Sequence, residues 1–220
     1  VLALDLGGTK LASAVFSSRG RVLESGAAPL DKRKGEEVGG LIVDQIRRCM
    51  DHGEEQIKAI GVSIPGIYRH RTGTVWAPNI DGWEDFSLFQ LIRKTFPGIP
   101  LAIDNDRACS MLGEQWRGRA QGCNDAVFLA VGTGIGAGIL SGGHIIRGAG
   151  DIGGATGWMA LKAPFHEKYS SCGCFEYYAS GAGIARFATE LLAEDPGYGG
   201  ILRQQKDHIV AHHVFEAYTM

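Results

Sequence analysis

The sequence of 220 residues lacks a long apolar run, a strong charge of either sign and a dense set of cysteines. No apolar run approaches the roughly 18 residues that a membrane-spanning helix needs, which predicts no membrane partner. Its 22 lysines and arginines nearly balance 24 acidic residues, giving a net charge of −2. The surface therefore offers no electrostatic basis for binding nucleic acid or an anionic membrane. Five cysteines are too few for a disulfide scaffold, which predicts reduced thiols and a cytoplasmic location.

The sequence also lacks an initiator methionine, and its last expected helix runs to Met220 without a cap or turn residues. These two features lead us to expect that residues are missing at both ends. The 45% hydrophobic and 21% charged composition is that of a globular chain. Its length allows one large domain or two modest ones.

Glycine is abundant, at 33 of 220 residues, which is about twice its usual frequency of ~7%. Two glycine-rich turns have matching designs: DLGGTK at residues 5–10 and GTGIGAG at residues 132–138. Each turn follows a short apolar run that predicts a strand. A glycine turn lets the backbone approach a bulky anion and direct several N–H donors at it. The pair predicts a phosphate held from two sides.

The apolar periodicity predicts alternating strands and helices in an α/β arrangement. We expect an opening meander of three strands, at residues 1–6, 11–16 and 21–28. A strand ending at residues 63–66 and another at residues 101–104 follow it. Helices are expected at residues 36–52, at residues 85–96 with Asp85 as the N-cap, and at residues 106–117.

A second meander begins near Asn124 and repeats the order of strand, glycine turn, strand, turn and strand. We interpret this as a weak internal duplication, with residues 117–123 as a hinge. The predicted domains are an N-terminal lobe at residues 1–118 and a C-terminal lobe at residues 119–220. A helix through about Leu192 and a last helix are expected near the end of the chain.

The first glycine turn combines an acid, two glycines, a hydroxyl and a lysine. Asp5 can hold a hydrated Mg²⁺ ion, which binds through few carboxylates together with phosphate oxygens. Gly7, Gly8 and Thr9 would donate backbone and hydroxyl groups to phosphate, and Lys10 would supply a point charge. The alternative is an ordinary hairpin turn, which a Gly-Gly pair alone would indicate.

The second glycine turn superficially resembles a dinucleotide-binding fingerprint. That fingerprint must open a helix, whereas the residues that follow predict a strand and another turn. We therefore reject NAD binding in favour of a hairpin that holds phosphate. Its candidate phosphate-binding residues are Gly132, Thr133, Gly134 and Gly136.

Asp104, Asn105 and Asp106 lie where a predicted strand becomes a helix. A carboxylate at this position can accept the proton of an attacking hydroxyl during phosphoryl transfer. The simpler interpretation is that Asn105 or Asp106 caps the helix, and the two roles can coexist. The segment IYRHRTG predicts a hairpin, and we expect His70 to lie at a solvated, charged tip.

These motifs together resemble the ROK family of sugar kinases (repressor, open reading frame, kinase), within the actin/hexokinase-like ATPase superfamily. DLGGTK and VGTGIGAGIL are similar to its two phosphate loops, and IDNDRACSMLGE is similar to its NDA-type helix start. VSIPG followed by PNIDGW is similar to the segments that close on the sugar. The resemblance implies a ribonuclease H-like (actin/hexokinase-type) two-lobed α/β fold, each lobe opening with a glycine-turn β-meander.

The resemblance assigns roles to particular residues. Asp106 is implied as the catalytic base, with ATP and Mg²⁺ as cofactors and a sugar as the small-molecule partner. The implied sugar-binding residues are Ser63, Pro65, Gly66, Asn79, Asn105 and Glu176. Dimerisation is common in the family, so a homodimer is a further expectation. The resemblance also implies roughly 80 to 100 further residues, since family members usually continue by that length beyond the end of this chain.

The chain departs from the family pattern after the second turn. Ala155 stands where a sugar-binding glutamate is expected, and Trp158 stands where a zinc-binding histidine is expected. We expect Trp158 to fill core volume rather than offer its face to a sugar. His166, Cys172 and Cys174 provide three N or S ligands without an obvious fourth, so we expect no structural zinc.

The leading functional hypothesis is ATP-dependent phosphorylation of a hydroxyl on a hexose or amino sugar, by a glucokinase-like enzyme. A non-catalytic sugar sensor of the same fold is the alternative, because Ala155 and Trp158 depart from the pattern. A third hypothesis replaces ATP with polyphosphate. The sequence does not identify the sugar.

Overall fold

The first sheet opens with the three-stranded meander that the sequence predicts. The computed structural model describes residues 1–52, 56–205 and 208–219. Its antiparallel strands are β1 (Leu2–Leu6), β2 (Lys10–Phe16) and β3 (Val22–Pro29). Two parallel strands, β4 (Ile60–Ile64) and β7 (Leu101–Asn105), complete the order β3-β2-β1-β4-β7.

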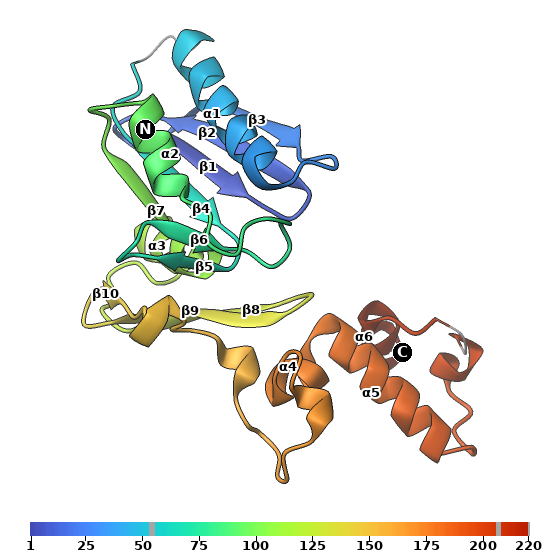
Figure 1. Ribbon diagram of the computed structural model, residues 1–220. Coiled ribbons are helices and arrows are strands. Elements are labelled where there is room, and N and C mark those ends of the chain that lie inside the picture. The colour runs from blue at the N-terminus through green and yellow to red at the C-terminus, as the bar shows by residue number, and fades with distance from the viewer. Residues whose placement is uncertain (53–55, 206–207, 220) are drawn as a thin grey trace.

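Two helices cover one face of this sheet, α1 (Gly35–His52) and α2 (Leu88–Thr95) (Figure 1). Leu2, Leu4 and Leu6 alternate along β1 and are buried in the core beneath these helices. The side chains between them point to the opposite face, because successive residues of a strand alternate sides. Asp5 on β1 is therefore exposed at the end of the strand.

The sequence prediction for α2 is wrong at its start. The helix begins at Leu88, and its N-cap is Ser87, two residues after the predicted cap Asp85. Asp85 instead accepts a hydrogen bond of 3.0 Å from Arg69, in an ion pair. The helix starts later because Phe86 pairs with Val75 through two backbone hydrogen bonds, of 2.9 Å and 3.0 Å, and sequence spacing gives no sign of that pairing.

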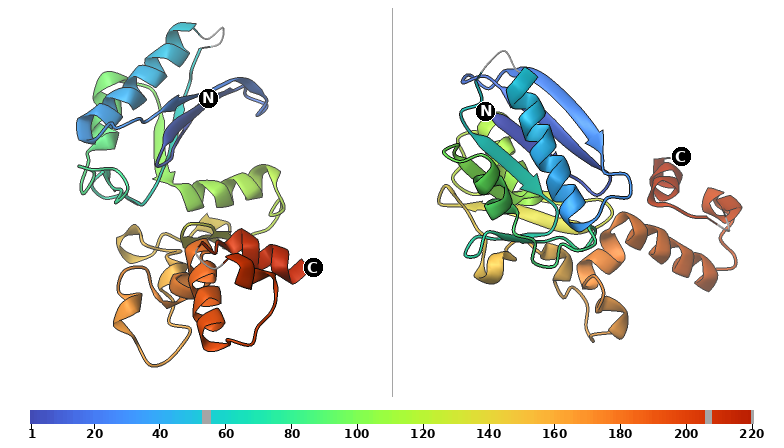
Figure 2. Two further views of the ribbon diagram at one scale, coloured as in Figure 1. Left: turned by 90° about the vertical axis from the view of Figure 1, so that its right-hand side faces the viewer. Right: turned by 45° about the horizontal axis from the view of Figure 1, so that its top comes forward.

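The second sheet is antiparallel and has the order β10-β9-β8. Its strands are β8 (Ala126–Val131), β9 (Ile135–Ser141) and β10 (His144–Ile145). Helix α3 (Asp106–Arg117) lies between the two sheets, as Figure 2 shows. Met111 of α3 packs with Leu140 of β9 in a small core of their own. Gly138 permits this close approach, because a Cβ there would collide with the backbone of α3 at Arg107.

The hairpin of β5 (Ile67–Arg69) and β6 (Thr74–Trp76) confirms the prediction for IYRHRTG. The other elements that the structure describes in the C-terminal region are helices. Its elements are η1 (Ala149–Asp151), η2 (Thr156–Trp158), η3 (Glu167–Tyr169), α4 (Cys174–Ala179), α5 (Gly181–Glu194), η4 (Ile201–Gln205) and α6 (Ala211–Thr219). The expected end of the last helix at Met220 lies outside the described residues.

Each sheet thus begins with a strand, a glycine turn and an antiparallel strand, as the sequence predicts. Among the residues that the structure describes, no helix is both long and apolar enough to cross a membrane.

Candidate functional site

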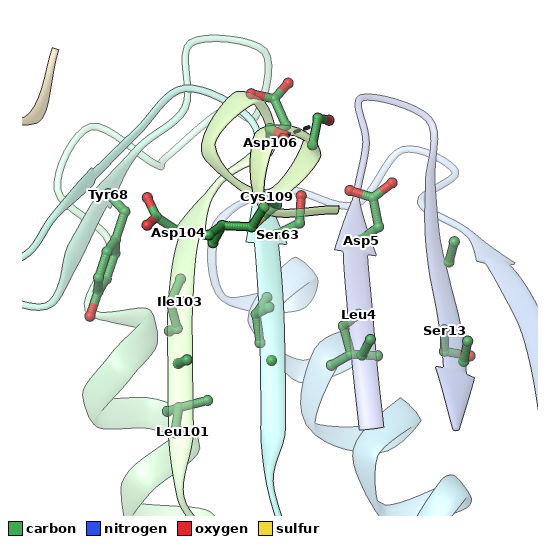
Figure 3. Close-up of a pocket in the computed structure, with 18 of the residues that line it drawn as sticks. Leu4, Asp5, Ser13, Ser63, Tyr68, Leu101, Ile103, Asp104, Asp106 and Cys109 are labelled. Atoms are coloured by element: carbon green, nitrogen blue, oxygen red, sulfur yellow. Dashed lines mark hydrogen bonds between the residues drawn. The ribbon is translucent and has the colours of Figure 1, made fainter. Parts of the chain in front are cut away.

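The carboxyl ends of three neighbouring strands bring polar side chains together. Asp5 on β1 pairs in register with Ser63 on β4, which in turn pairs with Asp104 on β7. Figure 3 shows these side chains at one end of the sheet, with Asp106 just beyond them. Asp5, Ser63, Asp104 and Asp106 line a cavity of about 840 Å³. Parallel pairing therefore produces this cluster from residues that are 58 and 41 positions apart in the sequence.

Asn105 is the N-cap of α3, as one of the two interpretations of the sequence holds. Its side-chain oxygen accepts a hydrogen bond of 2.9 Å from the Ala108 amide, and the residue is 8% exposed. The side-chain oxygen of Asn105, a residue expected to bind sugar, is therefore engaged in capping. Capping also fixes the first turn of α3, which positions the next residue, Asp106.

Asp106 is open to solvent, with 54% of its side chain exposed. One carboxylate oxygen accepts a hydrogen bond of 2.9 Å from the Arg107 backbone amide. The other oxygen remains available to an incoming group. An exposed carboxylate fixed at a helix start can accept a proton without the cost of burying its charge.

A second cavity, of about 1030 Å³, also includes Asp106 in its wall. It brings together predicted residues from five segments of the chain: Pro65, Gly66, Asn79, Asp106, Gly134, Gly136 and Glu176. Ser63 and Asn105 do not line this cavity. Since Asp106 borders both cavities, its carboxylate lies at the junction between the strand ends and the second glycine turn.

Glu176, on α4, holds the strand that follows the second glycine turn. Its Oε2 accepts a hydrogen bond of 2.7 Å from the Ile135 amide. Gly134 and Gly157 flank this carboxylate, and a Cβ at either position would lie 3.0 Å or 2.9 Å from Oε2. Glycine at both positions therefore leaves room for the glutamate.

The first glycine turn is a hairpin closed by a hydrogen bond of 2.9 Å from the Gly7 amide to the Lys10 carbonyl. Gly8 packs beside the side-chain amide of Asn79, and both residues line a separate cavity of about 290 Å³. Thr9 connects the turn to the end of β3, because its carbonyl accepts from Leu30 at 2.9 Å. The structure thus brings Asn79 to this turn but places the two glycine turns on different cavities.

The second glycine turn is closed by a hydrogen bond of 3.0 Å from the Gly132 amide to the Gly134 carbonyl. The Gly132 carbonyl accepts a hydrogen bond of 2.8 Å from the Gly181 amide, which ties the turn to the start of α5. Thr133, between them, is exposed. The turn is therefore held from behind while its tip remains accessible.

An ion-pair network that sequence reasoning missed joins the two sheets. Arg147, just after β10, donates hydrogen bonds of 2.6 Å and 3.2 Å to one oxygen of Asp104. His70 Nε2 lies 3.8 Å from the same oxygen, and His70 Nδ1 lies 2.9 Å from Asp151. The expectation of a merely solvated tip is therefore wrong for His70. Asp151 is 81 residues away in the sequence, so no local pattern could have found this contact.

Cys109 lies among the carboxylates at the strand ends (Figure 3). Burial, together with the negative charge of Asp104, raises the pKa of its thiol to about 11. A thiol with such a pKa is almost entirely protonated at neutral pH, and the thiolate is the nucleophilic form. At neutral pH the Cys109 thiol is therefore in its protonated, weakly nucleophilic form.

The residues that depart from the family pattern lie in the second cavity. Ala155 and Trp158 both line it, and 58% of the tryptophan is exposed. The expectation that Trp158 fills core volume is therefore wrong, since its ring borders open space.

Cys174 is buried and Cys172 is half-buried, both as free thiols. Within the described ranges, no three His, Cys, Asp or Glu side chains are grouped so as to hold a metal ion.

The two sheets, their glycine-turn meanders and the helix between them define the class of the fold. It is the ribonuclease H-like α/β fold of actin and hexokinase, as the sequence resemblance implies. The chain belongs to the ROK family, whose family model matches residues 1–219.

Three similar proteins illustrate the range of this family. A glucokinase from Halalkalibacterium halodurans is 34% identical over 205 residues, covering 88% of this chain and 60% of the relative. A putative xylose repressor from a Caldicellulosiruptor species is 35% identical over 144 residues, covering 64% of this chain and 35% of the relative. A solved ROK glucokinase from Streptomyces griseus, in complex with glucose and AMPPNP, matches with a TM-score of 0.71 and 28% identity. That match covers all of this chain and 70% of the glucokinase chain.

The chain spans about 60% of the length of the Halalkalibacterium glucokinase that it resembles. Sugar kinases and a repressor are thus both among its relatives.

Proposed function

We propose that the natural protein is an ATP-dependent sugar kinase that uses Asp106 as its general base. The position of Asp106 at the junction of two cavities carries this proposal. One cavity contains Asp5 and Ser63 at the strand ends, and the other contains the second glycine turn and Glu176. A carboxylate at this junction can reach an acceptor hydroxyl on one side and face the phosphoryl group on the other.

Asp106 would take the proton of the sugar hydroxyl as the oxygen attacks the γ-phosphorus. General-base catalysis of this kind contributes about 10²- to 10⁴-fold to the rate. The carboxylate needs freedom on one oxygen, which its 54% exposure supports. The Asn105 cap fixes the helix start, so the base is oriented before the sugar arrives.

The residues at the end of β1 fit a Mg²⁺–nucleotide complex. Asp5 is exposed and lines the cavity next to Asp106, and Mg²⁺ binds through few carboxylates together with phosphate oxygens. A bound Mg²⁺ would neutralise charge on the transferring phosphoryl group. Gly7, Gly8, Thr9 and Lys10 would hold phosphate from the first turn.

The second turn would hold phosphate from the other side, through Gly132, Thr133, Gly134 and Gly136. This assignment needs the two glycine turns to approach each other, since they border different cavities. Closure of an N-terminal lobe at residues 1–118 on a C-terminal lobe at residues 119–220 would bring them together. Such closure would also exclude water, which competes with the sugar as acceptor.

The sugar would lie in the larger cavity, against Pro65, Gly66, Asn79 and Glu176. Ser63 and Asn105 would contribute from the strand ends, with Asn105 acting through its side-chain nitrogen. The absence of a carboxylate at Ala155 removes one hydrogen-bonding partner for sugar hydroxyls, which changes the choice of sugar.

A non-catalytic sugar sensor is the second candidate, supported by the similarity to a putative xylose repressor. Asp5, Asp106 and both glycine turns are features of phosphoryl transfer that a sensor would not need. We therefore favour the kinase.

The five cysteines are all free in the structure, which supports a reducing, cytoplasmic compartment. A homodimer is the assembly that we expect in solution.

The test is a coupled ADP-release assay of the natural full-length protein across a panel of hexoses and amino sugars. We expect turnover with ATP on at least one sugar, and none without Mg²⁺. Isothermal titration calorimetry on the same panel distinguishes the alternatives. Binding of a sugar without turnover of any would support the sensor, and turnover with polyphosphate but not ATP would change the donor.

A further inference from the structure

Two buried polar atoms in the second cavity have no hydrogen-bond partner. Across residues 1–52, 56–205 and 208–219, the buried side-chain atoms without a partner are Arg107 Nε and Thr156 Oγ1. Both residues line the cavity that contains Asp106 and Glu176. A buried polar group without a partner costs about 1–3 kcal/mol. The two residues therefore give the wall of this cavity hydrogen-bonding capacity that the protein itself does not satisfy.

The Arg107 side chain lies against β9, the strand that follows the second glycine turn, and reaches into this cavity. Its Nη2 donates to the Gly66 carbonyl at 3.3 Å. A Cβ at Gly136 would lie 2.6 Å from Nη1, so glycine at that position is what lets the guanidinium lie there. The side chain is 26% exposed. Arg107 is therefore held in place by its stem, one hydrogen bond and an ion pair with Asp106.

The guanidinium keeps free hydrogen-bond donors. Nε lies 3.6 Å from the Asp106 carboxylate, which is beyond hydrogen-bond length. A guanidinium has five N–H donors, and the structure accounts for one of them within this site. The remaining donors can bind a planar anion through two parallel hydrogen bonds.

Two carboxylates lie near Arg107, and one of them, Asp106, forms an ion pair of 3.6 Å with its Nε. Glu176 accepts from the Ile135 amide at 2.7 Å, and Asp106 accepts from the Arg107 amide at 2.9 Å. Residue 155 is an alanine, so it adds no negative charge to the wall. An anionic ligand in this cavity would meet the Arg107 guanidinium. The two nearby carboxylates, Asp106 and Glu176, each already accept a hydrogen bond from a backbone amide.

Thr156 supplies a second donor from the same wall. It begins η2, which lies against β9, the strand that Arg107 also contacts. Its hydroxyl can donate to one oxygen of an anion while the guanidinium binds the others. Neutral sugar hydroxyls can also accept such bonds, but a bond to a charged acceptor is roughly twice as strong.

We propose that Arg107 and Thr156 select an acceptor sugar that carries an anionic group, either a carboxylate or a phosphate. The proposal rests on the sugar-kinase function proposed above and names its substrate class. Arg107 acts on substrate binding and not on the phosphoryl group in transfer.

The experiment compares kcat/KM of the natural full-length protein on neutral hexoses, hexuronic acids and hexose phosphates. We expect one of the two acidic classes to be preferred, which distinguishes carboxylate from phosphate. Arg107→Ala should lower the ratio of acidic to neutral kcat/KM by about 10- to 100-fold, as expected for a lost charge-assisted pair. Arg107→Lys should restore part of it, and Thr156→Val should lower it by less. Arg69→Ala is the matched control, since Arg69 pairs with Asp85 away from this cavity.

Calorimetry without a phosphate donor separates this proposal from the kinase function. If no sugar is turned over but an acidic sugar binds in an Arg107-dependent manner, the kinase function fails and this inference stands. An equal loss of kcat/KM on acidic and neutral sugars in Arg107→Ala would place Arg107 on the phosphoryl group and overturn the proposal. A wild-type preference for neutral sugars, unchanged in the ratio by Arg107→Ala, would also overturn it.

Discussion

Replacing Arg147 by alanine should destabilise the protein by breaking the ion pair that joins the two sheets. Arg147 donates two hydrogen bonds, of 2.6 Å and 3.2 Å, to one oxygen of Asp104. Asp104 has 11% of its side chain exposed, and Arg147 has 37% exposed. The substitution therefore leaves a mostly buried carboxylate without its strongest donors.

The expected loss follows from these exposures. Removing one partner of a fully buried pair costs about 3–5 kcal/mol, whereas an exposed pair contributes about 0–1 kcal/mol. The pair is half-way between these limits, because water reaches the arginine but hardly reaches the carboxylate. We expect the free energy of unfolding to fall by about 2 kcal/mol.

Urea unfolding of the natural full-length protein measures this loss, with Arg47→Ala as the control. Arg47 pairs with Asp44 at 3.2 Å on the surface of α1, with both side chains more than half exposed. A double-mutant cycle with Asp104→Asn should give a coupling energy above 1 kcal/mol. If Arg147→Ala costs no more than Arg47→Ala, the ion pair does not stabilise the junction of the sheets and the reasoning is refuted.

One further substitution and one chemical modification test the site. Gly136→Ala should lower the free energy of unfolding by about 1–3 kcal/mol, because its Cβ would meet the Arg107 guanidinium. In urea unfolding, Gly40→Ala in α1 should instead be neutral or stabilising, since a Cβ there meets nothing within 4 Å; equal losses would contradict the account. Cys109, whose pKa is raised from 9.0 to about 11, should react with iodoacetamide about 100-fold more slowly at pH 8 than an ordinary thiol. The alkylation rate of Cys109 should rise with pH up to about 11, and mass spectrometry can follow it. If Cys109 is alkylated as fast as the exposed Cys123, its thiol is not shielded.

The elements of the fold could be predicted where local patterns decide them. The alternation of Leu2, Leu4 and Leu6 indicates a half-buried strand, and the observed β1 confirms it. The predicted helix at residues 106–117 coincides with α3, because Asn105 is a strong N-cap. The predicted start of α2 is wrong because Phe86 pairs with Val75 instead of opening the helix, and no local pattern indicates that pairing.

The site could be predicted as far as its motifs reach. The glycine turns and the carboxylate at a strand end are local features, and the family resemblance adds Gly66 and Glu176. Gly66, Asp106 and Glu176 do line one cavity. Contacts between the sheets could not be predicted. His70 meets Asp151, 81 residues away, through the packing of a hairpin against η1. Arg107 follows Asp106 directly, but only the structure shows its unpartnered nitrogen in the cavity.

The central claim is that Asp106 is the base of a phosphoryl-transfer reaction, and the Asp106→Asn variant tests it most directly. Asparagine has nearly the same size and can still accept the Arg107 amide hydrogen bond, and the side chain is 54% exposed. The thermal unfolding temperature should therefore stay close to that of the natural full-length protein. In the ADP-release assay, kcat should fall by about 10²- to 10⁴-fold while sugar binding by calorimetry persists. Undiminished kcat in Asp106→Asn would contradict the account.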